Sequence, residues 1–136
     1  VGLILAGGNQ SWVGRSDTML AATGEDGILT AAEIADMDLR GMDLVVLSAC
    51  ETGLGELDGM EGTMGLFRAF KLAGVENVVQ SFWSVPDKET QELMAAFYSR
   101  LTAGEDPQSA FSGAQKAMRN RYPNNPAKWA AFTLMR

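Results

Sequence analysis

Histidine is absent from this 136-residue sequence, and cysteine occurs once, as Cys50. Because histidine is the usual general base at neutral pH, acid–base chemistry here must use carboxylates or a base from elsewhere. A single thiol excludes an internal disulfide, and without histidine it cannot build a structural zinc site. We therefore expect a cytoplasmic protein that needs no disulfide framework.

Basic residues and long apolar runs are also scarce. Eleven Lys and Arg against 17 Asp and Glu leave a net charge of -6, which argues against direct binding to nucleic acid. Apolar runs such as 44–47 are far shorter than the roughly 20 residues that cross a bilayer, so we expect a soluble protein with no membrane partner. A hydrophobic content of 46% suffices for a folded core.

The hydrophobic periodicity predicts an α/β fold. Short continuous apolar runs predict buried strands at residues 1–6, 43–48, 77–83 and 129–135. Thr30 and Glu33 have the spacing of a capping box, which predicts a short helix to about Met37. Apolar residues at helical spacing predict helices over residues 59–73, ending at Gly74, and from Asp87 as N-cap up to Gly104. Asp106-Pro107 begins another helix. The order of these elements predicts one domain with a layered, mostly parallel sheet and helices on both faces.

Ligands bind open α/β sheets beyond the carboxyl ends of the strands, which makes residues 48–50 and 82–84 candidate sites. Cys50 follows the first of these strands, and backbone N–H groups near Gly53 are suited to receive an oxyanion. A lone cysteine is more often a buried small hydrophobe. A catalytic thiol also needs a base, which we expect from sequence outside this chain.

Two other functions of the glycine-bearing loop, nucleotide binding and metal binding, have weaker support. The glycines from Gly53 to Gly59 lack the spacing of a dinucleotide fingerprint, whose third glycine is replaced by Asp58. The acids Glu56, Asp58 and Glu61 do not have the spacing of a calcium loop. We therefore predict no metal and no nucleotide cofactor.

Five ordered segments make the sequence resemble the CHAT domain, a family of caspase-like and separase-like cysteine peptidases often fused to TPR repeats. These segments are Asp26–Ile34, Asp43–Gly53, Leu66–Phe70 with Ala73–Gly74, Ser81–Asp87 and Trp129–Phe132. The resemblance implies a caspase-like fold in which residues 1–136 form the C-terminal portion of one incomplete domain. It also implies that Cys50 is the nucleophile of a cysteine endopeptidase and that the catalytic histidine precedes Val1.

The resemblance further implies a substrate-specificity pocket, with Trp83 as a wall and Asp87 as an acid that receives Arg or Lys; the alternative role of Asp87 is a helix cap. The implied partners are a protein or peptide substrate, the missing N-terminal half of the domain and TPR repeats. The isolated chain is expected to be inactive, and its unpaired sheet edge to favour a dimer. The alternative function is a non-catalytic interaction or scaffold domain with the same fold.

Overall fold

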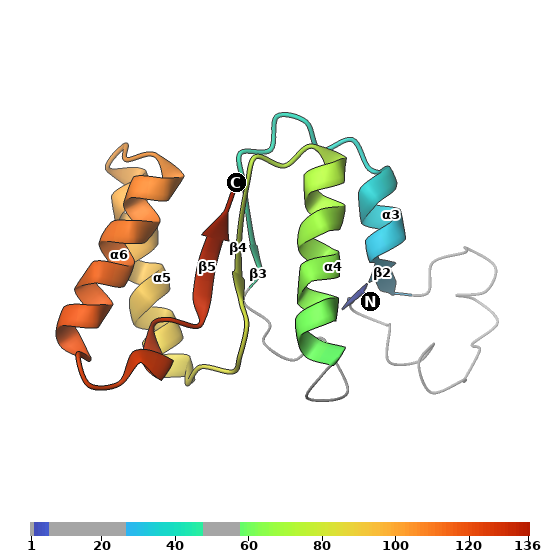
Figure 1. Ribbon diagram of the computed structural model, residues 1–136. Helices are drawn as coiled ribbons and strands as arrows, with labels where there is room; N and C mark the ends of the chain where they lie inside the picture. Colours follow the sequence, from blue (N-terminus) through green and yellow to red (C-terminus); the bar gives the residue numbers. More distant parts are fainter. Residues whose placement is uncertain (1, 6–26, 48–57) are drawn as a thin grey trace. The chain divides into compact units, whose positions relative to one another are not determined.

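The computed structural model describes residues 2–5, 27–47 and 58–136 (Figure 1). The chain forms two compact units, which are considered separately below. The first consists of Val1–Leu39 with Thr52–Gly74, and the second of Arg40–Glu51 with Val75–Arg136. Both units contain helices and strands, which agrees with the predicted α/β class. Within the described ranges, no helix has the length and apolar character needed to cross a bilayer.

The first unit contains a small hairpin and two helices. Strand β1 (Gly2–Ile4) pairs antiparallel with β2 (Ile28–Thr30), and helices α3 (Ala31–Asp36) and α4 (Asp58–Ala73) follow. The capping box predicted at Thr30 is confirmed: its Oγ1 accepts from the Glu33 N–H at 3.2 Å, and Glu33 Oε2 accepts from the Thr30 N–H at 2.7 Å. Strand β2 was not predicted, because three residues are too few to show a period.

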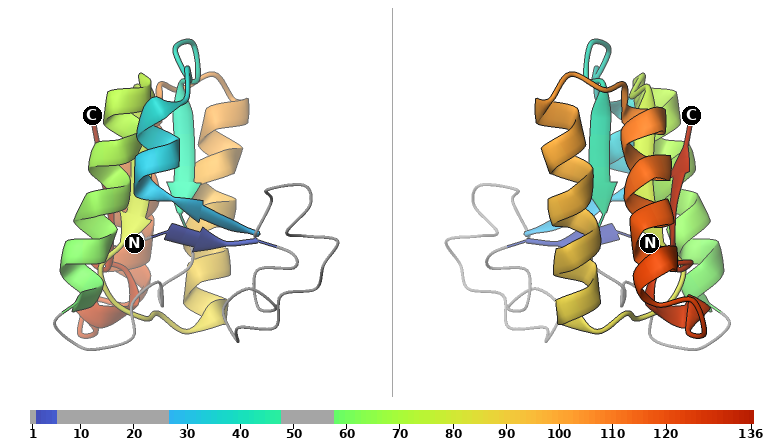
Figure 2. Two further views of the ribbon diagram at one scale, coloured as in Figure 1. Left: turned by 90° about the vertical axis from the view of Figure 1, so that its right-hand side faces the viewer. Right: turned by 90° about the vertical axis from the view of Figure 1, so that its left-hand side faces the viewer.

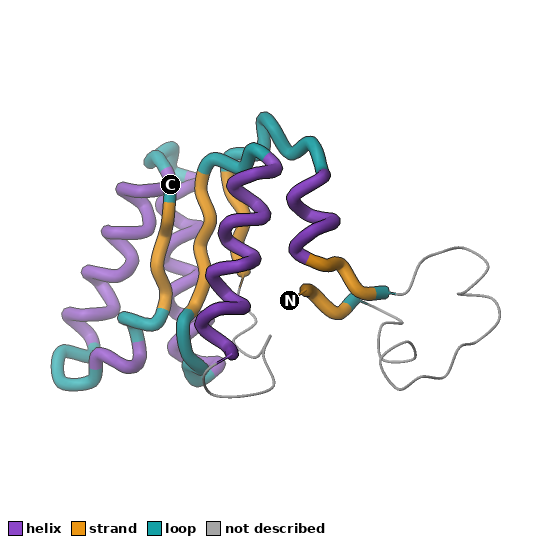
Figure 3. Tube along the Cα trace, turned by 45° about the vertical axis from the view of Figure 1, so that its right-hand side comes forward, coloured by secondary structure: helices purple, strands orange, loops and turns teal. Residues whose placement is uncertain are grey.

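The second unit contains a three-stranded sheet. Its strands β3 (Leu44–Leu47), β4 (Asn77–Ser81) and β5 (Phe132–Met135) lie in the order β3-β4-β5, with β4 in the middle (Figure 3). Strand β3 is parallel to β4, whereas β5 is antiparallel to it. Among the described strands, one of three pairings is therefore parallel, so the mostly parallel sheet predicted from the sequence is not established by these pairings.

Helices α5 (Asp87–Thr102) and α6 (Pro107–Arg121) connect β4 to β5 and lie side by side on one face of this sheet (Figures 1 and 2). Leu93 and Phe97 of α5 are buried, as are Ala110, Phe111, Ala114 and Met118 of α6, whereas Ala117, expected on the inner face of α6, is exposed. The Phe97 and Phe111 rings meet edge to face at 5.4 Å. Asp106 caps α6 with Pro107 in its first turn, as predicted. The buried core of the unit consists of Val79, Val85, Leu93, Phe97, Ala110, Phe111, Ala114, Met118, Ala131 and Phe132.

The last strand is shorter than the sequence predicted. It begins at Phe132 instead of Trp129, because a 3-10 turn, η1 (Pro126–Lys128), precedes it. The Trp129 N–H donates to the Pro126 carbonyl at 3.1 Å, so this backbone donor is used in the turn. The apolar character of Trp129 therefore reflects packing against the core of the unit, and not pairing in the sheet.

Candidate functional site

The candidate site lies at the carboxyl edge of the sheet in the second unit. Because β3 and β4 are parallel, with Leu47 opposite Gln80, their carboxyl ends lie at the same edge. The chain leaves β4 there toward Phe82 and Trp83, and Cys50 comes three residues after Leu47 in the sequence. Cys50 and Gly53 themselves lie outside the described residues.

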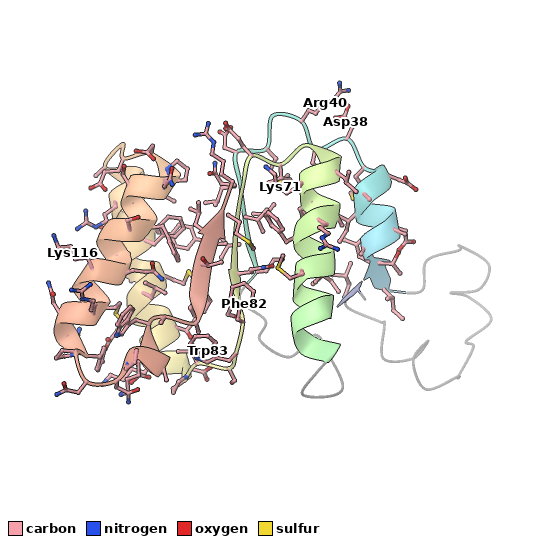
Figure 4. All side chains as sticks on the ribbon, viewed as in Figure 1. Asp38, Arg40, Lys71, Phe82, Trp83 and Lys116 are labelled. Carbon is pink, nitrogen blue, oxygen red and sulfur yellow. The ribbon has the colours of Figure 1, made fainter. Side chains whose placement is uncertain are left out.

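Trp83 is held at this edge by the segment that leads into β5. The Phe82 N–H donates to the Ala131 carbonyl at 2.9 Å, and the Trp83 indole Nε1–H donates to the Ala127 carbonyl at 3.2 Å. Both residues lie at the end of β4 in Figure 4. Trp83 nevertheless remains 43% exposed. Its polar edge is fixed while part of the ring stays accessible to a ligand, which suits stacking of a cationic side chain.

The helix-cap role expected for Asp87 is wrong. Pro86 occupies the N-cap position of α5 without a side-chain cap hydrogen bond, and Asp87 is the first helical residue. A cap must be in extended backbone before the helix, so a residue inside the first turn cannot act in this way. Asp87 is exposed, and in the part of the chain that the structure describes its carboxylate has no hydrogen bond or ion pair.

The other acids near the start of α5 are paired. Glu89 is 5% exposed, and its Oε1 lies 2.6 Å from the Lys128 Nζ. The Tyr122 hydroxyl donates to Glu92 Oε2 at 2.8 Å, and Arg121 Nη2 lies 3.5 Å from Glu92 Oε1. Lys128 Nζ also lies 4.6 Å from the centre of the Tyr122 ring. Asp87 is thus the acid of this group whose carboxylate forms no ion pair or hydrogen bond with a described side chain.

These contacts shift three pKa values. The hydrogen bond from Lys128 lowers the pKa of Glu89 below its ordinary 4.5, although burial opposes the shift, and the same bond raises the pKa of Lys128. The hydrogen bond to Glu92 raises the pKa of Tyr122. Sequence reasoning missed this network, because Lys128 and Glu89 are 39 positions apart and no local pattern links them. The contact between Lys128 and Glu89 joins η1 to α5. Lys128 follows Ala127, whose carbonyl accepts the hydrogen bond from Trp83.

We expect the Glu89–Lys128 pair to make stability depend on pH. A lowered folded-state pKa gives Glu89 a contribution that is present above the unfolded pKa and is lost as the pH falls through the folded-state value. Lys128→Met removes the partner and leaves a buried carboxylate, so it should destabilise the protein most near neutral pH and less in acid. Urea unfolding across the acidic range measures both effects.

Lys116→Met is the matched control for this experiment, because Lys116 is an exposed cation with no hydrogen bond or ion pair in the described part of the chain. It should leave the pH profile of stability close to that of the parent. If Lys128→Met lowers the free energy of unfolding by the same amount at every pH, the hydrogen bond from Lys128 is not what lowers the pKa of Glu89.

Gln80 is a further polar group at this end of β4. It is 1% exposed, and neither its amide nitrogen nor its amide oxygen has a hydrogen-bond partner among the described residues. Its strand position puts its side chain on the face opposite that of Val79, which belongs to the core beneath α5 and α6. Buried amides without partners are rare. No local pattern singles out Gln80 in the predicted strand 77–83.

Comparison with known proteins adds family information to this geometry. The CHAT domain profile matches residues 1–136. Tetratricopeptide repeat protein 28 of Mus musculus is 34% identical over 109 residues, and the protein of the same name from Homo sapiens is 33% identical over 109 residues. Each alignment covers 79% of this chain but 4% of the relative, so the chain spans a small part of the length of these curated relatives. No solved structure matches the chain.

The family match agrees with the arrangement of the second unit. Its profile includes the segment around Cys50 and the segment from Ser81 to Asp87, which follow the two parallel strands that share a carboxyl edge. The match extends over every residue of the sequence. The chain therefore belongs to the CHAT domain family, a caspase-like family.

Proposed function

We propose that this chain is the C-terminal portion of a caspase-like cysteine endopeptidase domain with Cys50 as its nucleophile. The observation that carries the proposal is the parallel pairing of β3 with β4. It makes the chain leave β3 toward Cys50 at the same edge where it leaves β4 toward Trp83. In open α/β sheets this carboxyl edge is where ligands bind. Membership of a caspase-like family supports the same assignment.

In the proposed mechanism, a histidine from the segment that precedes Val1 removes the proton of the Cys50 thiol. The thiolate sulfur attacks the scissile carbonyl carbon, and backbone N–H groups near Gly53 stabilise the resulting oxyanion. The protonated histidine gives its proton to the leaving amine as the C–N bond breaks. Water then hydrolyses the thioester with the histidine as base, which releases the acid product and restores the thiol.

The proposed substrate has Arg or Lys on the acyl side of the scissile bond. Trp83 offers a partly exposed ring, and Asp87 offers an exposed carboxylate that no described side chain binds. Glu89 and Glu92 are already paired with Lys128, Tyr122 and Arg121. An Arg guanidinium is suited to stack on the ring and to donate two hydrogen bonds to the carboxylate. An acidic substrate side chain would instead meet an unbalanced negative charge.

A scaffold function is the second candidate. The observation that favours it is that the 136 residues contain no histidine, so catalysis depends on a residue from outside the chain. Both matched relatives are named as tetratricopeptide repeat proteins. We infer that such repeats belong to the same full-length protein as this chain. A caspase-like domain beside them would then bind partner proteins without cleaving them.

The isolated chain tests the first proposal directly. We expect it to cleave no peptide, because its thiol lacks a histidine, while Cys50 still reacts with iodoacetamide in its folded state. Mass spectrometry should show a single adduct that is absent from Cys50→Ala, and addition of the preceding segment should restore cleavage. Efficient cleavage by the isolated chain that Cys50→Ala abolishes would show that another group is the base.

A further inference from the structure

Positive charge is concentrated in the last part of the chain. Residues 107–136 hold five of its eleven Lys and Arg and none of its 17 Asp and Glu. Lys128, Arg121 and Arg136 pair with acids from earlier in the sequence. The side chains of Lys116 and Arg119 form no hydrogen bond or ion pair in the described part of the chain. Figure 4 shows Lys116 pointing away from α6.

Arg119 lines an open groove between the end of α6 and the turn before β5. The other lining residues are Asn120, Pro123, Pro126 and Trp129, and together with Arg119 they define the α6 groove. The Trp129 Nε1–H donates to the Tyr122 carbonyl at 3.2 Å, and the Trp129 N–H donates to the Pro126 carbonyl. These bonds hold the Trp129 side of the groove in place before any ligand binds, and the proline rings restrict the backbone at Pro123 and Pro126.

We propose that the α6 groove docks an extended segment of a partner protein that carries Asp or Glu beside apolar residues. The Arg119 guanidinium is suited to bind a carboxylate through two N–H groups. The Asn120 amide can exchange hydrogen bonds with a peptide backbone. Trp129 and the prolines offer apolar surface to the neighbouring side chains, as do the aromatic grooves that bind extended peptides.

The charges around the groove favour this occupant over a basic one. The acids of α5 that pack toward this end of the unit, Glu89 and Glu92, are balanced by Lys128, Arg121 and the Tyr122 hydroxyl. The positive charge of Arg119 is therefore not cancelled by a described acid. Preformed walls also reduce the entropy lost on binding. The proposal does not depend on Cys50, and it holds for a peptidase or a scaffold.

The test uses short fluorescein-labelled peptides in which proline alternates with glutamate, glutamine or lysine, because alternating proline keeps each peptide extended. Fluorescence anisotropy with the whole chain should show that the glutamate peptide binds at least about tenfold more tightly than the glutamine peptide. The lysine peptide should show no binding. Added salt should weaken the glutamate complex, because the contact is exposed.

Arg119→Gln should weaken binding of the glutamate peptide by about tenfold, because it removes the charged hydrogen bonds but keeps most of the side chain. Lys116→Gln is the matched control: it removes the same charge from the same helix outside the groove and should change binding by less than about twofold. Circular dichroism confirms that both variants fold, and Asn120→Ala provides a second groove variant that should also weaken binding.

Equal effects of Arg119→Gln and Lys116→Gln would overturn the proposal, since binding would then follow net charge alone. Equal affinities for the glutamate and glutamine peptides, or no binding of the glutamate peptide, would overturn it as well. Sedimentation that shows a dimer of this chain, lost on Arg119→Gln, would assign the groove to a second copy and not to a separate partner.

Discussion

Replacing Cys50 with alanine is expected to lower peptide cleavage by the full-length protein by about a thousandfold or more. Cys50 is the only cysteine of these 136 residues, so no other thiol of this segment can replace it. Loss of a nucleophile leaves the contribution of substrate binding and of the oxyanion donors, which is a small part of the total rate enhancement. The ratio kcat/KM for a peptide with arginine at the cleavage site is the measurement.

Cys50→Ser is the companion variant. A serine hydroxyl keeps the size of the side chain but is a much weaker nucleophile at neutral pH than a thiolate, so we expect a similar loss of activity. The scaffold function makes the opposite forecast: neither variant would change the binding of partner proteins, and the parent would cleave nothing. Retention of full cleavage by Cys50→Ala would remove Cys50 from the mechanism.

Local signals in the sequence predicted the helix ends well. The capping box at Thr30 and the Asp106-Pro107 start of α6 are both present. Gly74 and Gly104, which end helices in the prediction, adopt φ values of 104 and 93 degrees, a region that glycine enters without steric cost. These features depend on residues three or four positions apart, so the sequence carries them directly.

Features that depend on distant residues were not predictable in the same way. The antiparallel pairing of β5 with β4 and the hydrogen bond from Trp83 to Ala127 each join segments more than 40 positions apart. Glu89 and Lys128, which are 39 positions apart, form a further contact of this kind. The cap assigned to Asp87 failed because Asp is common both at the N-cap and in the first turn of a helix, and composition does not separate the two positions.

The position of Asp87 inside the first turn sharpens the distinction between a structural and a substrate-binding role. A carboxylate there gains only the favourable interaction with the helix N-terminus, about 1 kcal/mol or less at an exposed position. Asp87→Asn removes the negative charge and keeps the size of the side chain. Thermal unfolding should therefore change little. Any large effect of this substitution must come from the ligand that the carboxylate receives.

We expect Asp87→Asn in the full-length protein to reduce kcat/KM for substrates with Arg or Lys at the cleavage site by about a hundredfold, because loss of one member of a desolvated ion pair costs several kcal/mol. Glu92→Gln is the matched control: it makes the same charge change in the same helix, on an acid already bound by Tyr122, and should leave the substrate preference unchanged. If Asp87→Asn cleaves basic substrates as well as the parent, or if the parent prefers acidic residues, Asp87 does not select the substrate.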